Sequence, residues 1–391
     1  MTPWLGITWG ISNRFGWGVY GLNLVRELLR KGETFPVCFG DIAVNTLNDE
    51  TRELLAPVIK FRNDNLSSFM RETKVAQLGN AVVLHALGND AEWSLISNSI
   101  EGDKNIGVIF FEHSDISAAG LNRLSKLDQI VAGSTWNADV MIDAGVKNVV
   151  TVFQGIDTSL FRPMPRSGTY NDKFAVFSGG KLDYRKGQDI VLAAFKAFAQ
   201  ERDDVMLVTA WHNLWPLTAA QFRHSPHMST LPYVGADDRL NITRMATDNG
   251  IPESKFVDLG LLPNEEMPGI LKEMDLAVFP NRCEGGTNLV AMETMACGVP
   301  CILSQNTGHM DIINDGGCWV LEQQNRVSFE GMATDGWGES SVDELVALME
   351  HAYENRAQAR KIGQTGAEFM RSWSWPAQIE LLLSNVEKTL V

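Results

Sequence analysis

The sequence is short of cysteine, of basic residues and of long apolar runs. Its five cysteines are an odd number without a Cys-x-x-C pair, so we expect free thiols and a cytoplasmic location. Lysine and arginine total 33 against 48 acidic residues, and the net charge of -15 argues against nucleic acid or anionic lipid as a partner. No stretch approaches the roughly 18 apolar residues of a membrane-spanning helix, and the first ten residues lack a signal-peptide pattern. We therefore expect a protein without a transmembrane segment.

Low-complexity tracts and short repeats are also missing, and apolar strand-like runs alternate with helix-period segments. Strands are expected at 4–9, 35–40, 81–87, 106–111, 129–133, 149–153, 174–180, 205–210, 255–260, 275–280, 301–304 and 318–321, with helices at 19–32, 188–201 and about 288–297. This alternation is typical of α/β proteins, in which helices cover both faces of parallel sheets. The pattern restarts after residue 165, and two prolines and a glycine interrupt it at 161–168. The 391 residues therefore predict two domains, at 1–163 and 164–371.

A glycine loop followed by a short helix, between residues 284 and 298, is the most informative segment. Gly285 and Gly286 let a ligand approach the backbone closely, and the following helix start offers N–H groups suited to a phosphate. Glu293 is an isolated acid on an otherwise apolar helix, and its carboxylate suits the two hydroxyls of a ribose. The alternative is a solvent-facing glutamate on an ordinary crossover helix.

A second segment, at 177–189, places three cations beside a predicted helix start. Lys181, Arg185 and Lys186 lie among glycines in a turn, and they reverse the local sign of an acidic protein. This arrangement suits a pyrophosphate group. The alternative is a solvated basic loop.

Together these segments resemble the donor-binding elements of retaining GT-B glycosyltransferases of family 4, the glycosyl transferases group 1. In that family two glutamates bracket a glycine-containing loop; Glu284 and Glu293 do so here, one residue further apart than usual. The run from Gly180 to Gly187 resembles the family's G-R-L-x-x-x-K-G element, with Lys181 in place of the arginine. The resemblance covers most of the chain and is strongest over 174–321.

The resemblance implies two Rossmann-like domains that face each other across a cleft, with a closing helix at 372–391 that returns to the first domain. It implies transfer of a hexose-type sugar from a nucleotide donor to a hydroxyl acceptor. The sequence identifies neither the nucleotide nor the acceptor; we expect a UDP-linked donor in preference to a GDP-linked one. The chain lacks Asp-x-Asp, the metal–diphosphate clamp of the other large glycosyltransferase fold. We therefore expect lysines to stabilise the diphosphate, with no metal and no other cofactor.

The resemblance also implies roles for individual residues. Glu293 would hold the ribose, Glu284 would lie beside the transferred sugar, and Lys181 and Lys186 would neutralise the leaving diphosphate. The further candidates for contact with the donor in this half are Gly180, Arg185, Trp211, Leu262, Gly285, Gly286, Thr287, Asn288 and Leu289.

The N-terminal half contains G-x-G-x-x-G at Gly16, Gly18 and Gly21, with Asp41 further on. Taken literally this is a dinucleotide fingerprint and would favour an NAD-dependent oxidoreductase. A polar stretch separates the first glycine from the preceding strand, however, which weakens that interpretation. Under the resemblance, Gly16, Trp17 and Gly18 instead line the cleft.

Glu112 and His113 follow the strand at 106–111, at the family's catalytic-loop position, where one of them would touch the sugar or the acceptor. The alternative is a capped strand-to-helix turn. His224 and His227 form H-x-x-H without evident further ligands, a weak zinc signal. A nucleotide-sugar epimerase, a phosphorylase and a non-catalytic sugar-binding protein remain alternatives on the same fold.

Overall fold

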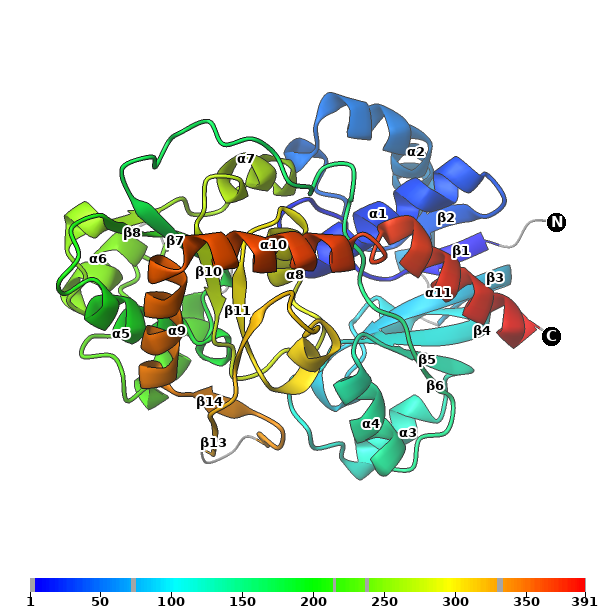
Figure 1. Cartoon of the computed structure of the whole chain (residues 1–391). Coiled ribbons are helices and arrows are strands. Elements are labelled where there is room, and N and C mark those ends of the chain that lie inside the picture. Colours follow the sequence, from blue (N-terminus) through cyan, green and yellow to red (C-terminus); the bar gives the residue numbers. More distant parts are fainter. Residues whose placement is uncertain (1–3, 72–74, 214–215, 236–238, 329–332, 391) are drawn as a thin grey trace. The chain divides into compact units, whose positions relative to one another are not determined.

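The computed structural model describes residues 4–71, 75–213, 216–235, 239–328 and 333–390 (Figure 1). Contacts divide the chain into two compact units. Unit 1 comprises Met1–Gly155 and Trp373–Val391, and unit 2 comprises Ile156–Ser372. The units divide at Gly155, before the proline-containing segment at which the sequence suggests a boundary, and the end of the chain groups with unit 1.

Unit 1 is built on a parallel sheet of six strands in the order β2-β1-β3-β4-β5-β6. The strands are β1 (Trp4–Ile7), β2 (Phe35–Cys38), β3 (Ala76–Leu87), β4 (Ile100–Ile109), β5 (Gln129–Ala132) and β6 (Val149–Thr151). The helices are α1 (Gly16–Lys31), α2 (Asp49–Arg71), α3 (Ala118–Leu124), α4 (Thr135–Asp143) and α11 (Trp375–Leu390), with short 3-10 turns η1 (Val44–Thr46), η2 (Asn89–Ala91) and η3 (Ser97–Ser99).

Helix α1 shows how local sequence fixes the element. It ends where expected, because Gly32 takes the left-handed conformation (φ 69°) that closes a helix C-terminus at little cost. It begins at Gly16, earlier than the sequence suggests. A Cβ added to Gly18 would lie 2.9 Å from the Ser12 backbone nitrogen, so a glycine is needed where the helix passes the preceding loop. Helix α11 packs on α1, with the rings of Tyr20 and Trp375 stacked 5.6 Å apart.

Unit 2 repeats the architecture with a parallel sheet in the order β12-β11-β10-β7-β8-β9. The strands are β7 (Phe174–Lys181), β8 (Val205–His212), β9 (Phe256–Asp258), β10 (Leu276–Phe279), β11 (Cys301–Ser304) and β12 (Trp319–Leu321), with an antiparallel pair β13 (Gln324–Arg326) and β14 (Gly338–Ser340). The helices are α5 (Gln188–Phe198), α6 (Ile242–Asp248), α7 (Met267–Leu271), α8 (Leu289–Ala296), α9 (Val342–Glu354) and α10 (Arg356–Met370), and the 3-10 turns are η4 (Tyr184–Lys186), η5 (Pro216–His224), η6 (Glu253–Lys255), η7 (Asn264–Glu266) and η8 (Thr307–Asp311).

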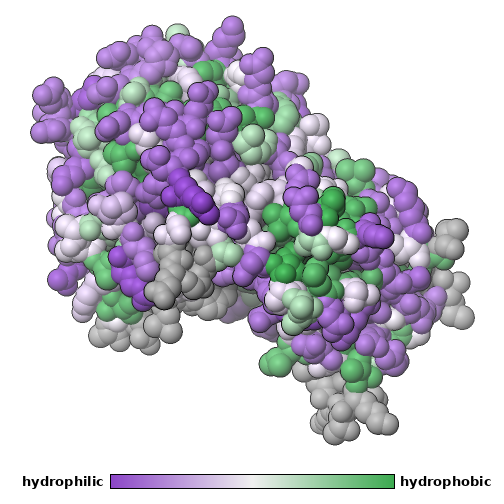
Figure 2. Space-filling view, turned by 90° about the horizontal axis from the view of Figure 1, so that it is seen from below, coloured by the Kyte–Doolittle hydropathy of each residue, from purple (hydrophilic) through white to green (hydrophobic). Residues whose placement is uncertain are grey.

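Two parallel α/β sheets confirm the predicted fold class. The core strands β7, β10 and β11 are buried almost throughout, as expected of a sheet covered on both faces. Within the described ranges, no helix has the length and apolar character needed to cross a bilayer. The face of the molecule drawn in Figure 2 is largely hydrophilic, with apolar residues in smaller groups.

Candidate active site

The two segments singled out from the sequence meet at one edge of the sheet of unit 2. Strands β7 and β10 are hydrogen-bonded neighbours, so the turn η4 after β7 and the loop after β10 leave the sheet side by side. The backbone N–H groups of Arg282 and Cys283 donate to the carbonyl oxygen of Arg185 at 2.6 and 3.2 Å. The cationic turn and the acidic loop are therefore held together by their backbones, independently of their side chains.

Glu284 lies at the centre of this contact and is only 4% exposed. One carboxylate oxygen forms an ion pair with Lys186 Nζ and accepts from Asn281 Nδ2, and the other lies 3.4 Å from Arg185 Nη1. Burial opposes ionisation, but Lys186 and Arg185 outweigh it and lower the pKa of Glu284. The carboxylate is therefore charged at neutral pH.

Lys181 lies at the end of β7 and pairs with Asp183 Oδ2 at 3.1 Å. Gly180, just before it, adopts a φ of 117° that favours glycine. Three cations, at 181, 185 and 186, are thus gathered around two carboxylates, Asp183 and Glu284. The basic turn is an ordered, partly buried group, and the alternative of a freely solvated basic loop is wrong.

Helix α8 starts at the end of the glycine loop, as predicted. Asn288 is its N-cap, in a left-handed conformation (φ 62°, ψ 85°), and its side chain accepts a hydrogen bond from the Ala291 N–H. Thr287 is buried, with its hydroxyl 3.0 Å from the Met292 sulfur. Gly285 is buried, whereas Gly286 and Leu289 are half-buried. One of the helix-start donors expected to be free is thus already satisfied by the cap.

Glu293 is buried in α8, 5% exposed, so the solvent-facing alternative is wrong. Asn264 Nδ2, from η7, donates to its Oε1 at 2.7 Å. Burial raises the pKa of Glu293 to about 8, and the Asn264 hydrogen bond only partly opposes this. A buried carboxyl group without a cationic partner is costly to the fold, and such groups gather at functional sites.

Leu262 and Trp211, the two remaining candidates for contact with the donor, differ in burial. Leu262 is half-buried in the loop before η7, close in sequence to Asn264. Trp211 is wholly buried on β8, and its indole N–H donates to Ser178 Oγ at 3.3 Å. A contact of Trp211 with the donor stays a prediction; β8 extends beyond the predicted strand, to His212.

In unit 1, Glu112 and His113 are half-buried, and both backbone N–H groups donate to Asn89 Oδ1, at 2.8 and 3.2 Å. The neighbouring Asp90 and Ala91 both have positive φ (54° and 53°), a strained arrangement for residues other than glycine. Asp90 is held by Ser117 and Arg123. Asn89 therefore positions the predicted catalytic loop, and no motif in the sequence marks it.

The glycine loop of unit 1 lies near that same segment. Gly16 is exposed, and Trp17 is half-buried with its ring 4.8 Å from that of Phe110, which precedes Glu112 by two residues. The structure thus brings Trp17 beside Phe110, just before the predicted catalytic loop.

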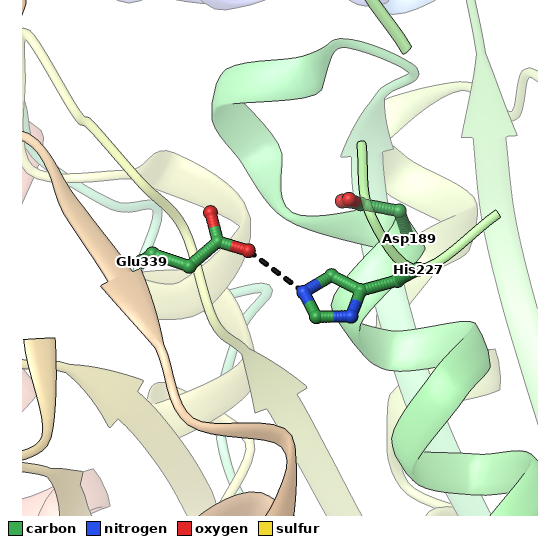
Figure 3. Close-up of side chains that lie close together, drawn as sticks. All are labelled: Asp189, His227 and Glu339. Atoms are coloured by element: carbon green, nitrogen blue, oxygen red, sulfur yellow. Dashed lines mark hydrogen bonds and ion pairs between the residues drawn. The ribbon is translucent and has the colours of Figure 1, made fainter. Parts of the chain in front are cut away.

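One group of side chains has the composition of a metal site. Asp189, His227 and Glu339 each offer a ligand atom within 4.8 Å of the others (Figure 3). His227 Nε2 lies 2.8 Å from Glu339 Oε1. Arg282, however, is fully buried against both carboxylates, with bonds to both oxygens of Asp189 and both of Glu339. A divalent cation would have to displace this guanidinium, so we interpret the group as an ion-pair network. His224, the other histidine of H-x-x-H, is not part of it.

Comparison with known proteins identifies the family of the chain. The family model described as Glycosyl transferases group 1 matches residues 163–369, just over half of the chain. D-inositol 3-phosphate glycosyltransferase 1 of Catenulispora acidiphila is 28% identical over 217 residues, which cover 51% of this chain and 46% of that protein. The GDP-mannose-dependent alpha-(1-6)-phosphatidylinositol monomannoside mannosyltransferase of Mycolicibacterium smegmatis is 24% identical over 235 residues, 56% of this chain and 51% of that protein.

The chain thus spans about half the length of the curated relatives it matches. Among solved structures, HepE from Anabaena in complex with UDP and glucose aligns with 99% of this chain and 100% of its own, with a TM-score of 0.65 at 14% identity. This likeness shows the GT-B fold.

The buried carboxyl group of Glu293 predicts a stability effect of known sign. Its pKa lies at about 8, above the ordinary value. Because the unfolded chain releases this proton at a lower pH than the folded protein does, the folded state loses stability as the pH rises towards 8. Glu293→Gln should therefore be more stable than the wild type at pH 8, by at least about 2 kcal/mol, because one pKa unit corresponds to about 1.4 kcal/mol. The advantage should shrink towards pH 5.

Thermal melts from pH 5 to 8 measure this difference. Glu253→Gln, which changes an exposed glutamate, is the matched control and should show no such trend. A difference for Glu293→Gln that does not vary with pH would contradict the assignment of a buried, protonated carboxyl group.

Proposed function

Because the chain belongs to the glycosyl transferases group 1 family, we propose that it moves a hexose-type sugar from a nucleotide donor to a hydroxyl acceptor with retention at the anomeric carbon. The observation that carries this proposal is the cluster of three cations, at 181, 185 and 186, where η4 meets the loop at 281–288, in a chain whose net charge is -15. We assign the donor to residues 164–371 and the acceptor to residues 1–163.

The cations of η4 would bind the donor diphosphate. Lys186 and Arg185 both reach Glu284, and Lys181 lies beside them at the end of β7. A diphosphate placed there gains charge as the glycosidic bond breaks, and these cations stabilise it more in the transition state than in the ground state. Glu284, fixed by the same cations, would contact the sugar, and the loop amides at 285–289 would contact the phosphate and sugar.

Glu293 would hold the ribose. Its carboxyl group already has an amide partner in Asn264, on a loop whose Leu262 would lie near the base. Ribose hydroxyls would supply hydrogen bonds that favour the ionised form, so donor binding should lower the pKa of Glu293 from about 8.

The transfer itself would need no enzyme nucleophile. The acceptor oxygen attacks the anomeric carbon on the face from which the diphosphate leaves; its bond to carbon forms as the bond to the phosphate oxygen breaks. The acceptor proton passes to a phosphate oxygen of the leaving group. Catalysis is then positioning and charge stabilisation, with His113 or Glu112 contacting the sugar or acceptor.

We favour a UDP-linked donor over a GDP-linked one in this proposal. HepE, whose fold this chain shares along nearly its whole length, was solved with UDP, whereas the mycobacterial relative is named for GDP-mannose. No observation favours an NAD-dependent oxidoreductase, since Gly18 is explained by the close approach of α1 to Ser12.

A donor screen tests the proposal directly. We expect slow hydrolysis of a UDP-sugar by the purified protein, and Lys186→Ala should lower turnover about 100-fold, because loss of one charge contact at the transition state commonly costs about 3 kcal/mol. Lys361→Ala, which removes an exposed lysine of α10, is the control. Turnover by the Lys186 variant within about twofold of wild type would remove that residue from the diphosphate site.

Metal removal provides a separate test. Since cationic side chains would carry the role of a divalent ion, hydrolysis should persist in EDTA at an unchanged rate. Loss of activity that magnesium or manganese restores would show that carboxylates of this chain bind a catalytic metal.

The acceptor side is tested at His113. His113→Ala should lower turnover at saturating donor by about 100-fold, within the 10²–10⁴ range of positioned acid–base groups, with little change in melting temperature. Asn89→Ala is the structural comparison: it removes the acceptor of two backbone N–H groups and should lower the melting temperature. If His113→Ala lowers the melting temperature and preserves turnover, the catalytic contact of this unit moves to Glu112.

A further inference from the structure

His309 is a wholly buried histidine beside the loop at 284–288, which we call the donor loop, and none of the proposed roles uses it. It lies in the turn η8, after β11. Both ring nitrogens have a partner: Nδ1 lies 2.9 Å from Ser304 Oγ, and Nε2 lies 3.0 Å from Asn288 Nδ2. The imidazole therefore bridges the end of a core strand to the N-cap residue of α8.

The direction of each hydrogen bond around His309 follows from two backbone groups, one that contacts Asn288 and one that contacts Ser304. At one end the Ala291 backbone N–H can only donate, so it fixes Oδ1 of Asn288 as its acceptor. The amide nitrogen of Asn288 then faces His309 and must donate to Nε2. Nε2 therefore carries no proton.

At the other end the Asn281 carbonyl can only accept, and Ser304 Oγ donates to it at 2.7 Å. Because the hydroxyl proton of Ser304 is used in that bond, its oxygen can only accept from His309 Nδ1. Both ends thus require the same form of the ring, a neutral imidazole with its proton on Nδ1. The opposite tautomer would place two donors against each other at Asn288.

The turn that carries His309 also supports the donor loop through backbone contacts. The Glu284 N–H donates to Thr307 Oγ1 at 2.8 Å, and the Gly308 N–H donates to the Glu284 carbonyl at 3.0 Å. A Cβ on Gly308 would lie only 1.8 Å from the Gly286 carbonyl oxygen. The donor loop is therefore pressed against η8, and His309 is the side chain that joins the two at the loop's far end.

Asn288 requires such support because it is a non-glycine residue with φ 62°. Asparagine tolerates the left-handed region better than most residues, yet the conformation persists only where surroundings fix it. Its side chain is held at two points, the Ala291 N–H and the His309 ring.

We propose that His309 is a positioning residue for donor binding: as a neutral imidazole protonated on Nδ1, it locks the side chain of Asn288 and with it the left-handed backbone that shapes the loop at 284–288. The link to donor binding rests on the proposed function; the tautomer does not. Burial lowers the pKa of His309 to about 4, although Glu284 opposes this and Lys186 reinforces it. The ring therefore stays neutral across the physiological range.

Nuclear magnetic resonance of the full chain with ¹⁵N-labelled histidine tests the tautomer. Of the seven histidines, the one whose signals disappear in His309→Gln should show a protonated Nδ1 and an unprotonated Nε2, unchanged from pH 6 to 8. Asn288→Asp replaces the donor opposite Nε2 by an acceptor and should move a proton to that nitrogen. A titrating ring, or a proton on Nε2 in the wild type, would overturn the proposal. If His309→Gln does not fold, the Asn288→Asp spectrum identifies the signal.

A double-mutant cycle on UDP affinity, measured by calorimetry with GDP as a second arm, tests the link to function. His309→Gln should raise the dissociation constant for UDP about tenfold in the Asn288 protein, and by less than about twofold in an Asn288→Gly background, where glycine takes the left-handed conformation unaided. Equal effects in both backgrounds would overturn this inference alone. If the wild type binds neither nucleotide, the proposed function fails, and the donor-binding role fails with it.

Discussion

The donor-side geometry depends on the buried charge of Arg282. Its guanidinium is fully buried, pairs with Asp189 and Glu339, and stacks 3.8 Å from the ring centroid of Tyr184. It also donates to the Tyr184 carbonyl, so one side chain ties together the turn η4, the start of α5 and the hairpin strand β14. Removing one partner from such a group commonly costs about 3–5 kcal/mol, because the remaining charge is left buried and unpaired. The ion pairs of Arg282 with Asp189 and Glu339 thus help to fix the turn that carries Lys186 against the donor loop.

The two glutamates that bracket the donor loop, Glu284 and Glu293, differ in charge state because their surroundings differ. Both are almost fully buried, but Glu284 faces Lys186 and Arg185, whereas Glu293 accepts from the amide of Asn264 and feels the like charge of Asp157. Cations lower the pKa of Glu284, and burial raises that of Glu293. One carboxylate is therefore a fixed charge in the free protein. Glu293 becomes ionised only when additional hydrogen-bond donors reach it, which makes its charge sensitive to a hydroxyl-bearing ligand.

Much of the fold and part of the site follow from local sequence. Alternating apolar runs gave both sheets, Gly32 and Gly298 ended helices as expected, and charge with glycine marked η4 and the loop at 284–288. Other features depend on contacts between distant segments and leave no local pattern. Asn89 meets Glu112 across 23 positions, Asn264 meets Glu293 across 29, and Arg282 meets Asp189 across 93. The burial of Trp211 is a further example, since only packing shows that its ring is fully covered.

The pairing of Lys186 with Glu284 bears on how binding energy would be used. Lys186 is half-buried, and burial lowers its pKa, while Glu284 opposes that shift. Its charge is already satisfied before a ligand arrives, so a ground-state diphosphate must share the cation with a carboxylate and gains little. As the glycosidic bond breaks, the leaving group gains negative charge and competes better for the same nitrogen. A cation held by a fixed internal partner thus favours the transition state over the bound substrate, which is the condition for an interaction to raise turnover instead of only tightening binding.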